Sequence, residues 1–237
     1  MELKPLISII VPVLNEEDNI RPLIEHVDEA ISSLVQRYDF EFIFTDNHSS
    51  DKTFEVLKEI STKDPRIRIF RFTKNFGFQA SILMGFKKCN GAAAIQLDCD
   101  LQDPPNLIPE FIQKWEEGSE VVYGIRRSRM EGKFIGKLRA LFYRLIDKLA
   151  DDTLPHDAGD FRLISRKVIN ILKTLDDTHP YLRGMIALIG FQQEGIPYDR
   201  NSRKSGMSKF SIPQLTSLAF DGILYHSIIP LRIASFA

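Results

Sequence analysis

Apolar residues in the first 125 positions fall into short continuous runs that alternate with helical stripes. The run at 6–13, LISIIVPV, is almost continuously apolar and β-branched, which is typical of a strand covered on both faces. Similar runs predict strands at 40–46, 66–72, 92–98 and 120–125. Apolar positions in 20–35 recur at intervals of three and four, which predicts a helix with one buried face. Further helices are predicted at 49–61, 76–89 and 106–117.

Strand and helix alternate with a period of about 25 residues, a spacing that favours a doubly wound α/β domain with a mostly parallel sheet. After residue 125 the pattern loosens. It predicts a basic loop at 126–134, a helix at 134–150, a short strand turning into a helix at 159–172, and a polar, basic loop at 199–209. We expect one domain over residues 1–210.

Composition narrows the class of protein. The chain has 237 residues, of which 43% are hydrophobic and 27% charged, as expected for one globular domain with a sizeable core. A net charge of −1 gives no reason to expect a nucleic-acid partner. Two cysteines form no disulfide framework, which favours a reducing compartment. No apolar run is long enough for a transmembrane helix, and the N-terminal run reads as a strand and not as a signal peptide.

Acidic and amide side chains follow three of the predicted strands, at 15–18, 46–47 and 98–100. The carboxyl ends of such strands form the edge where open α/β sheets bind ligands. If the backbone stays extended, Asp98 and Asp100 point to the same side. Two carboxylates on one face suit Mg²⁺ or Mn²⁺ that bridges to phosphate. Zinc is disfavoured because Cys99 has no nearby His or second Cys.

Helix capping is the alternative explanation for each acidic cluster. Asn15 or Asp18 would cap the first helix. Asp103 precedes Pro104, and proline favours the first helical position, so capping is the favoured role for Asp103. Capping alone explains less well why all three strand ends are acidic. No glycine-rich fingerprint follows the first strand, which disfavours an NAD enzyme. A nucleotide diphosphate would therefore need a metal and cationic side chains.

Several motifs together give a specific resemblance. The chain resembles the inverting glycosyltransferases of family 2 with the GT-A fold, and within them the branch of dolichol-phosphate-mannose synthase and bactoprenol glucosyltransferase. LDCDLQDPP is similar to that branch's D-x-D-L-Q-x-P-P signature. At DNHSSDKT the chain departs from common forms, so no direct role is assigned to Asn47 or His48. The motifs that carry the resemblance are SIIVPVLNEEDNI, FIFTDNHSSDKT, KNFGFQAS, IQLDCDLQDPP, GDFRLIS and RKSGMSKF.

The resemblance implies roles for the matching positions. The nucleotide base would meet the first two strand ends, Asp98 would lie near ribose and diphosphate, and Asp100 with Gln102 would hold the metal. Asp157 and Asp160 would lie at the sugar and acceptor side, unless they only form a turn that caps the strand at 161–164. The phosphates would meet basic side chains, unless these are only a solvated surface. The base group is Pro12, Leu14, Asn15, Glu16 and Asp46; the basic group is Arg126, Arg127, Arg139, Arg200, Arg203 and Lys204.

The segment 211–237 is apolar with few charges and follows a basic stretch. We expect an amphipathic helix in the membrane interface, the alternative being a terminal helix packed on the core. Relatives in the resembled family continue into transmembrane helices here, so we expect the chain to be truncated before them.

The resemblance implies metal-dependent, inverting transfer of a hexose from a nucleotide sugar, with UDP expected, to polyprenyl phosphate at the cytoplasmic face of the cell membrane. The partners would be the donor, the acceptor lipid and the membrane surface, with a homo-oligomer left open. Three alternatives stay open: transfer to a saccharide hydroxyl, a non-catalytic nucleotide-sugar-binding module, and a glycoside hydrolase with paired carboxylates. The parallel nucleotide-type sheet disfavours the hydrolase.

Overall fold

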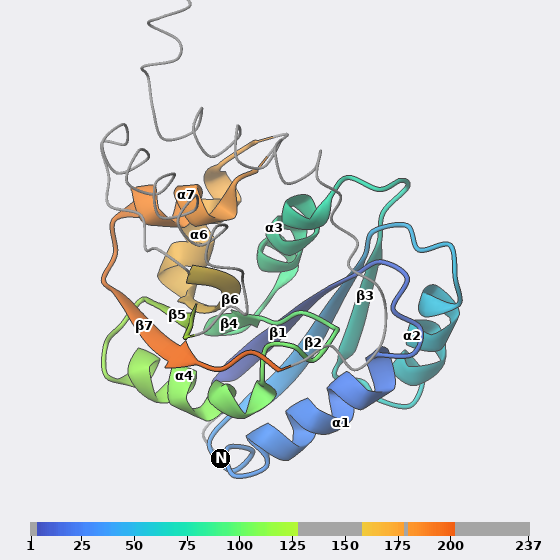
Figure 1. Ribbon diagram of the computed structural model, residues 1–237, viewed down its shortest axis with the longest axis horizontal. Helices are drawn as coiled ribbons and strands as arrows, with labels where there is room; N and C mark the ends of the chain where they lie inside the picture. Colours follow the sequence, from blue (N-terminus) through green and yellow to red (C-terminus); the bar gives the residue numbers. More distant parts are fainter. Residues whose placement is uncertain (1–3, 128–157, 178–179, 202–237) are drawn as a thin grey trace, which may run out of the picture.

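The computed structural model describes residues 4–127, 158–177 and 180–201, and strands alternate with helices through most of them (Figure 1). The strands are β1 (Leu6–Val13), β2 (Asp39–Asp46), β3 (Ile67–Arg71), β4 (Ala93–Gln96), β5 (Val121–Arg126), β6 (Ala158–Ser165) and β7 (Gln193–Tyr198). The helices are α1 (Ile20–Ile31), α2 (Thr53–Ser61), α3 (Phe78–Lys88), the 3₁₀ turn η1 (Pro105–Leu107), α4 (Ile108–Glu116), α6 (Arg166–Thr174) and α7 (Leu182–Ile189).

The strands form one seven-stranded sheet in the order β3-β2-β1-β4-β6-β5-β7. Neighbouring strands are parallel except around β6, which runs antiparallel to both β4 and β5. The mostly parallel, doubly wound sheet expected from the alternating pattern is therefore confirmed.

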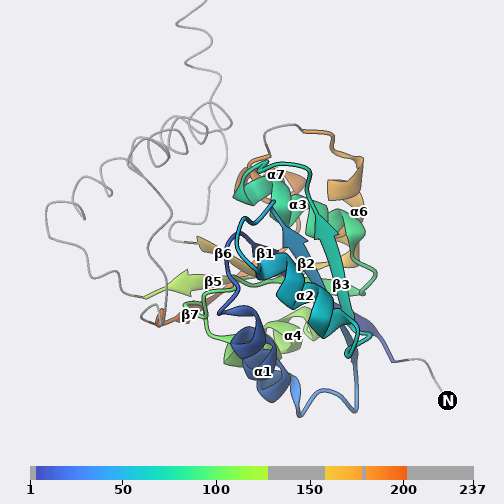
Figure 2. The same cartoon turned by 90° about the vertical axis from the view of Figure 1, so that its right-hand side faces the viewer.

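Helices cover both faces of the sheet, as Figures 1 and 2 show from two directions. Alternate residues of β1 point to opposite faces. Ile7, Ile9 and Val11 pack with α1, α2 and α4, whereas Ile10 packs with α3, α6 and α7. This burial on both sides accounts for the continuous apolar run that identified β1 in the sequence.

Chain direction decides which residues meet at the ligand-binding edge. Strands β1, β2, β4, β5 and β7 all run the same way, so their carboxyl ends lie at one edge. Because β6 runs the opposite way, its first residues come to that same edge, and Ala158 pairs with Ile125 near the end of β5. Asp160, near the start of β6, therefore joins residues that come after the other strands.

Three local expectations differ from the structure. Strand β4 ends at Gln96, and the chain turns at residues 99–100, so the extended backbone assumed for Asp98 and Asp100 is absent. Helix α2 begins at Thr53 instead of residue 49; the Asp51 carboxylate accepts the Thr53 N–H at 2.9 Å. Helix α1 begins after Asn19 with no side-chain cap, so neither Asn15 nor Asp18 caps it. The predicted helix at 134–150 and the segment 211–237 lie outside the described residues.

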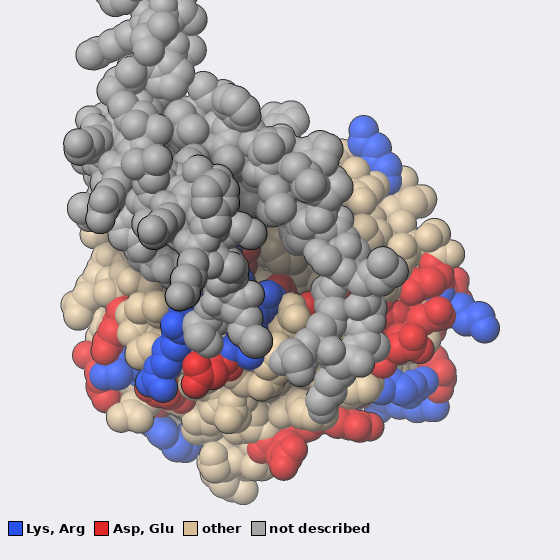
Figure 3. Space-filling model, in the orientation of Figure 1, with Lys and Arg blue, Asp and Glu red and all other residues tan. Residues whose placement is uncertain are grey.

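Charged side chains on the face shown in Figure 3 include acidic and basic groups side by side around α2. Glu59 there pairs with both Arg21 and Lys63. Within the described part of the chain, no helix is long and apolar enough to cross a membrane.

Candidate active site

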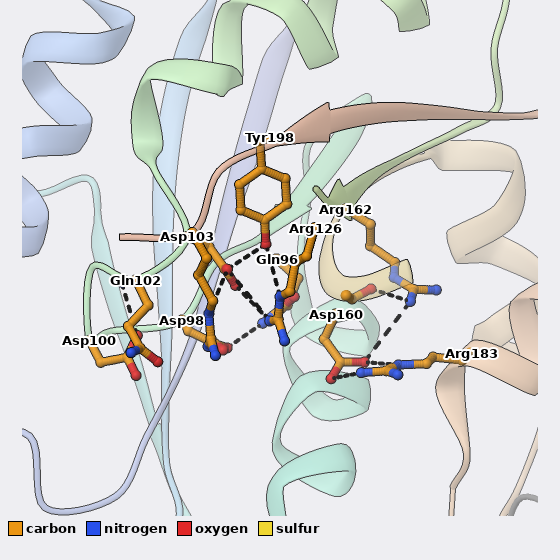
Figure 4. Close-up of polar contacts among 12 residues, drawn as sticks. Gln96, Asp98, Asp100, Gln102, Asp103, Arg126, Asp160, Arg162, Arg183 and Tyr198 are labelled. Atoms are coloured by element: carbon orange, nitrogen blue, oxygen red, sulfur yellow. Dashed lines mark hydrogen bonds and ion pairs between the residues drawn. The ribbon is translucent and has the colours of Figure 1, made fainter. Parts of the chain in front are cut away.

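The loop after β4 carries the first acidic residues of the site. Its turn places Leu101 in the left-handed region, with φ of 57°, a conformation that is strained for a residue with a side chain. The Asp100 Oδ1 atom accepts the backbone N–H of Gln102 at 3.2 Å, and Gln96 Nε2 donates to Asp98 Oδ1 at 2.8 Å. The strained turn thus keeps Asp98, Asp100 and Gln102 together beyond the end of β4 (Figure 4).

Asp103 is buried and lies among groups from three other parts of the sheet edge. Its Oδ1 accepts a hydrogen bond of 2.5 Å from the Tyr198 hydroxyl at the end of β7. Arg126, at the end of β5, approaches its Oδ2 to 3.4 Å, and Arg200 Nε lies 3.3 Å from Oδ1. The negative charge of Asp103 therefore faces two guanidinium groups.

The capping role predicted for Asp103 is wrong. The 3₁₀ turn η1 begins after Pro104, and no side chain caps it. The Asp103 carboxylate instead binds Tyr198, Arg126 and Arg200. Pro104 correctly indicated the start of a helical turn. The Asp103 carboxylate, however, contacts the guanidiniums of Arg126 and Arg200 instead of the turn.

Asp160 belongs to a second charged group at the same edge. Arg183, at the start of α7, binds it with two contacts, Nε to Oδ1 at 3.0 Å and Nη2 to Oδ2 at 2.9 Å. Burial alone would raise the pKa of Asp160, but Arg183, Arg162 and Gln79 lower it well below its ordinary value. Asp160 is therefore an ionised, paired residue within β6 and not part of a turn before the strand.

Arg162 is a second cation beside Asp160. It is buried, donates to the Gly159 carbonyl at 2.9 Å, and lies 4.0 Å from Asp160. Burial lowers the pKa of Arg162 to about 10, against the opposing effect of Asp160. The Arg162 guanidinium remains charged at neutral pH. The Asp160 carboxylate therefore offsets part of the free-energy cost of burying this charge.

The four carboxylates differ in how their charge is compensated. Asp103 and Asp160 have guanidinium partners, whereas Asp98 receives its hydrogen bond from the neutral amide of Gln96. Removal from water, together with the charges of Asp103, Asp160 and Asp100, raises the pKa of Asp98 to about 8, although Arg126 acts in the opposite direction. An additional cation near Asp98 would therefore stabilise the ionised form of this carboxylate.

The residues around Asp98 fit a divalent cation that is shared with a phosphate ligand. Asp98, Asp100 and Gln102 offer hard oxygen atoms, which suit Mg²⁺ or Mn²⁺. Among the residues that the structure describes, no group of three or more His, Cys, Asp or Glu side chains is arranged to hold a metal by itself. A cation here would take only one or two protein ligands, as Mg²⁺ does when substrate phosphates complete its coordination.

The loops after β1 and β2 form the other half of the edge. Asn15 adopts φ of 52°. Its backbone N–H donates to Ser49 Oγ at 2.9 Å, and its Oδ1 accepts the Ser50 N–H at 2.8 Å, which joins it to the loop after β2. The Glu16 N–H donates to Thr53 Oγ1 at 2.8 Å. These contacts hold Asn15 and Glu16 against the loop that follows Asp46.

Asp46 is fully buried at the end of β2. Its Oδ1 accepts the Ser49 N–H at 2.9 Å, and its Oδ2 lies 3.3 Å from Arg71 Nε. Because Arg71 also binds the Ser49 carbonyl at 3.0 Å, the ion pair fixes the loop after β2 against the end of β3.

Comparison with known proteins shows the family to which a chain with this sequence belongs. Residues 8–172 match the family model described as Glycosyl transferase family 2. The chain belongs to this family. The glycosyltransferase is 41% identical over 231 residues to the "Uncharacterized glycosyltransferase YkcC" of Bacillus subtilis (strain 168), across 97% of this chain and 71% of that protein. It is 34% identical to the "Bactoprenol glucosyl transferase" of Shigella phage SfV, across 97% and 75%.

Solved structures show the same fold. A mannosyltransferase from Pyrobaculum calidifontis, in complex with GDP-Man and Mn²⁺, superposes with a TM-score of 0.60 at 14% identity over 94% of this chain and 70% of its own. Glucosyl-3-phosphoglycerate synthase from Mycobacterium tuberculosis, in complex with Mn²⁺, UDP and phosphoglyceric acid, gives 0.59 at 18% over 93% and 77%. The glycosyltransferase therefore has the GT-A fold expected from its motifs.

The structure places most of the predicted site residues of this glycosyltransferase at one edge. Pro12 lies in β1 beside β2, and Leu14 follows the strand. Arg127 continues the pairing of β5 with β7 through its backbone, and its side chain is exposed. Asp157, Arg139, Arg203 and Lys204 lie outside the described residues.

Four polar residues of the edge were not predicted from the sequence. Gln96, within β4, was counted only as part of an apolar run. Arg162 and Arg183 bind or approach Asp160, and Tyr198 binds Asp103. Tyr198 ends the segment QEGIPY, which was not predicted as a strand; placing β7 beside β5 would have brought its last residue to the edge.

Proposed function

We propose that the glycosyltransferase moves a hexose from a nucleotide sugar, expected to be a UDP sugar, to polyprenyl phosphate, with inversion at the anomeric carbon and with Mg²⁺ or Mn²⁺. The observation that carries this proposal is the cluster at the edge: the oxygen atoms of Asp98, Asp100 and Gln102 lie together, beside the carboxylates of Asp103 and Asp160 that bind guanidiniums. A bactoprenol glucosyl transferase at 34% identity supports the lipid acceptor.

In this proposal the donor lies across both halves of the edge. Asp100 and Gln102 hold the metal, and Asp98 lies near ribose and diphosphate. Arg126, Arg127 and Arg200 face the phosphates with Arg139, Arg203 and Lys204; Asp157 and Asp160 lie toward sugar and acceptor. The base lies against Pro12, Leu14, Asn15, Glu16 and Asp46. The loops after β1 and β2 are joined by hydrogen bonds and would form a rigid surface against which the base packs.

The proposed reaction requires compensation of the substrates' negative charge more than it requires a general base. A phosphate monoester has a second pKa of about 6, so a polyprenyl phosphate is largely dianionic at neutral pH and attacks the anomeric carbon without a proton acceptor. When bound, the metal would stabilise negative charge on the leaving diphosphate. Arginines near the acceptor offset the repulsion between the two anionic substrates, because a guanidinium binds two phosphate oxygens at once.

The same proposal places the enzyme at the cytoplasmic face of the cell membrane. Polyprenyl phosphate is a membrane lipid, so its phosphate must be reached from the bilayer surface. The basic stretch at 200–209 and the apolar segment 211–237 have the composition of an interfacial anchor. A GT-A domain over 1–210 would thus carry its own surface-binding segment.

We expect UDP to stabilise the protein much more with Mn²⁺ than in excess chelator. No glycine-rich phosphate-binding fingerprint follows the first strand, so the diphosphate charge must be compensated in another way. A metal ion beside Asp98 and Asp100 would provide that compensation. Thermal unfolding with UDP, with Mn²⁺, with both, and with chelator measures the difference. Equal stabilisation by UDP with and without the metal would contradict the metal assignment.

Replacing Arg203 and Lys204 by Ala should weaken use of the acceptor more than binding of the donor. These residues precede the apolar segment 211–237, so their charge would meet the lipid phosphate. Steady-state kinetics with a short-chain polyprenyl phosphate should show a several-fold higher acceptor KM and a nearly unchanged donor KM. A change confined to the donor KM would count against this assignment, and Lys63→Ala, in the turn after α2, serves as the charge-loss control.

A further inference from the structure

The Tyr198 hydroxyl lies between charged groups from separate strands (Figure 4). It accepts the Arg126 Nε–H at 3.1 Å and donates to Asp103 Oδ1 at 2.5 Å. Arg200 Nε lies 3.3 Å from the same oxygen of Asp103. One hydroxyl therefore joins the loop after β4, the end of β5 and the end of β7.

The position of this hydroxyl is fixed by packing of the Tyr198 ring. The side chain is buried and contacts Phe161 edge to face, with ring centroids 6.0 Å apart. The ring fits because residue 124, on the neighbouring strand, is glycine: a Cβ atom there would lie 2.6 Å from Tyr198 Cε1. Burial and the neighbouring Asp103 raise the pKa of Tyr198 well above its ordinary value, so the hydroxyl keeps its proton and remains a donor.

A backbone contact joins the same two segments. The Asn201 N–H donates to the Gln102 carbonyl at 2.9 Å. Residues 198–201 are thus bound to residues 102–103 through the Tyr198 hydroxyl, the Arg200 guanidinium and one backbone hydrogen bond. The basic stretch of the chain continues directly from this attachment, at Arg203 and Lys204.

We infer that Tyr198 is a positioning residue: its hydroxyl binds Arg126 directly and also binds the Asp103 carboxylate that Arg200 contacts, and it thereby fixes both guanidiniums beside the loop of Asp100 and Gln102. This inference rests on the proposed function, in which both arginines face phosphates. Asp103 would then serve the site indirectly, by setting the positions of two cations. Charge-assisted hydrogen bonds of this kind hold geometry well because they are short and directional.

A purely structural brace predicts something different. Loss of a brace lowers stability and reduces activity only as far as the protein unfolds. Loss of a positioning contact leaves the fold intact and weakens phosphate binding, because misplaced charges lose interaction energy with the ligand. Ligand affinity measured on folded protein separates the two.

The direct test is Tyr198→Phe, which removes only the hydroxyl and keeps the ring between Gly124 and Phe161. The control is Tyr123→Phe on β5, whose hydroxyl makes no hydrogen bond among the described residues. We expect Tyr198→Phe to raise the Kd of UDP with Mn²⁺, measured by calorimetry, roughly tenfold, and to lower kcat by a similar factor. Its Tm should stay within about 4 °C of the parent. Tyr123→Phe should match the parent in all three.

Two further variants test the route of the effect. Gly124→Ala displaces the Tyr198 ring without removing a polar group, and should also weaken binding of UDP with Mn²⁺. The double variant Tyr198→Phe with Asp103→Ala should bind UDP with Mn²⁺ about as weakly as Asp103→Ala alone, because Asp103→Ala already removes the carboxylate to which the Tyr198 hydroxyl donates.

The inference is overturned if Tyr198→Phe binds UDP with Mn²⁺ as Tyr123→Phe does, or if the losses in the double variant multiply. A parent protein that binds UDP with Mn²⁺ but transfers no hexose to polyprenyl phosphate would count against the proposed function alone. The comparison of Kd values would still decide the role of Tyr198.

Discussion

Asp100→Asn should fold as the parent does and lose most of its transferase activity. The Asp100 carboxylate accepts the Gln102 N–H through one oxygen, and the Asn side chain retains an oxygen for that bond. Asn is neutral and a weaker ligand for a cation that must offset diphosphate charge. Removal of one such electrostatic element commonly costs about 10²–10³ in rate. Initial rates at saturating donor, with Tm measured alongside, test this expectation.

The matched control for Asp100→Asn is Asp39→Asn. Asp39 is exposed at the start of β2, at the opposite edge of the sheet, and undergoes the same chemical change. It should keep the rate of the parent. If Asp100→Asn retained more than about a tenth of the parental rate, Asp100 would not be the principal protein ligand of the metal.

Asp160→Ala should cause the largest loss of stability among the site variants. It leaves Arg183 without its two-contact partner and the buried Arg162 without a nearby carboxylate. Removing one partner of a buried ion pair typically costs about 3–5 kcal/mol; we expect about 3 because Arg183 reaches the surface. That loss lowers the Tm by roughly 6–12 °C for a domain of this size.

The pH dependence of stability provides a second measure of the same ion pair. The folded-state pKa of Asp160 lies well below its ordinary value. Its contribution is therefore fully present above the unfolded pKa of about 4 and is lost as the pH falls toward the folded value. The Tm difference between the parent and Asp160→Asn should be largest near pH 7 and should narrow below about pH 4.

Asp64→Asn is the control for this stability effect. Asp64 pairs with Arg66 at 2.6 Å on the partly exposed side of the molecule, where such pairs contribute about 1 kcal/mol or less. A loss in Asp160→Ala no larger than in Asp64→Asn, or a Tm difference that widens in acid, would contradict the assignment of Asp160 as a largely buried, ionised partner of Arg183.

The order of elements could be predicted because it depends on local patterns. Runs such as 6–13 are apolar at every position since both faces of the strand are covered, and the stripes at 20–35 match one buried helix face. The acidic edge followed from parallel strands ending together. The turn from β6 into α6 was also visible locally, at 159–172.

The partners within the edge could not be predicted in the same way, because they depend on strand pairing. Asp103 and Tyr198 are 95 residues apart, and they meet only because β7 lies beside β5. The antiparallel insertion of β6 between β4 and β5 likewise brings Gln96 beside Arg162. Local sequence near Asp103 indicated a cap, and tertiary contacts with two guanidiniums overrode that indication.

The most direct test of the account is to incubate the protein with Mn²⁺, a panel of UDP-hexoses and a short-chain polyprenyl phosphate, and to analyse the lipid fraction by mass spectrometry. The account predicts a polyprenyl phosphohexose that forms with metal, disappears in excess chelator and is made at most at a trace rate by Asp100→Asn. Formation of the same product in excess chelator, or hexose transfer only to saccharide hydroxyls, would contradict it.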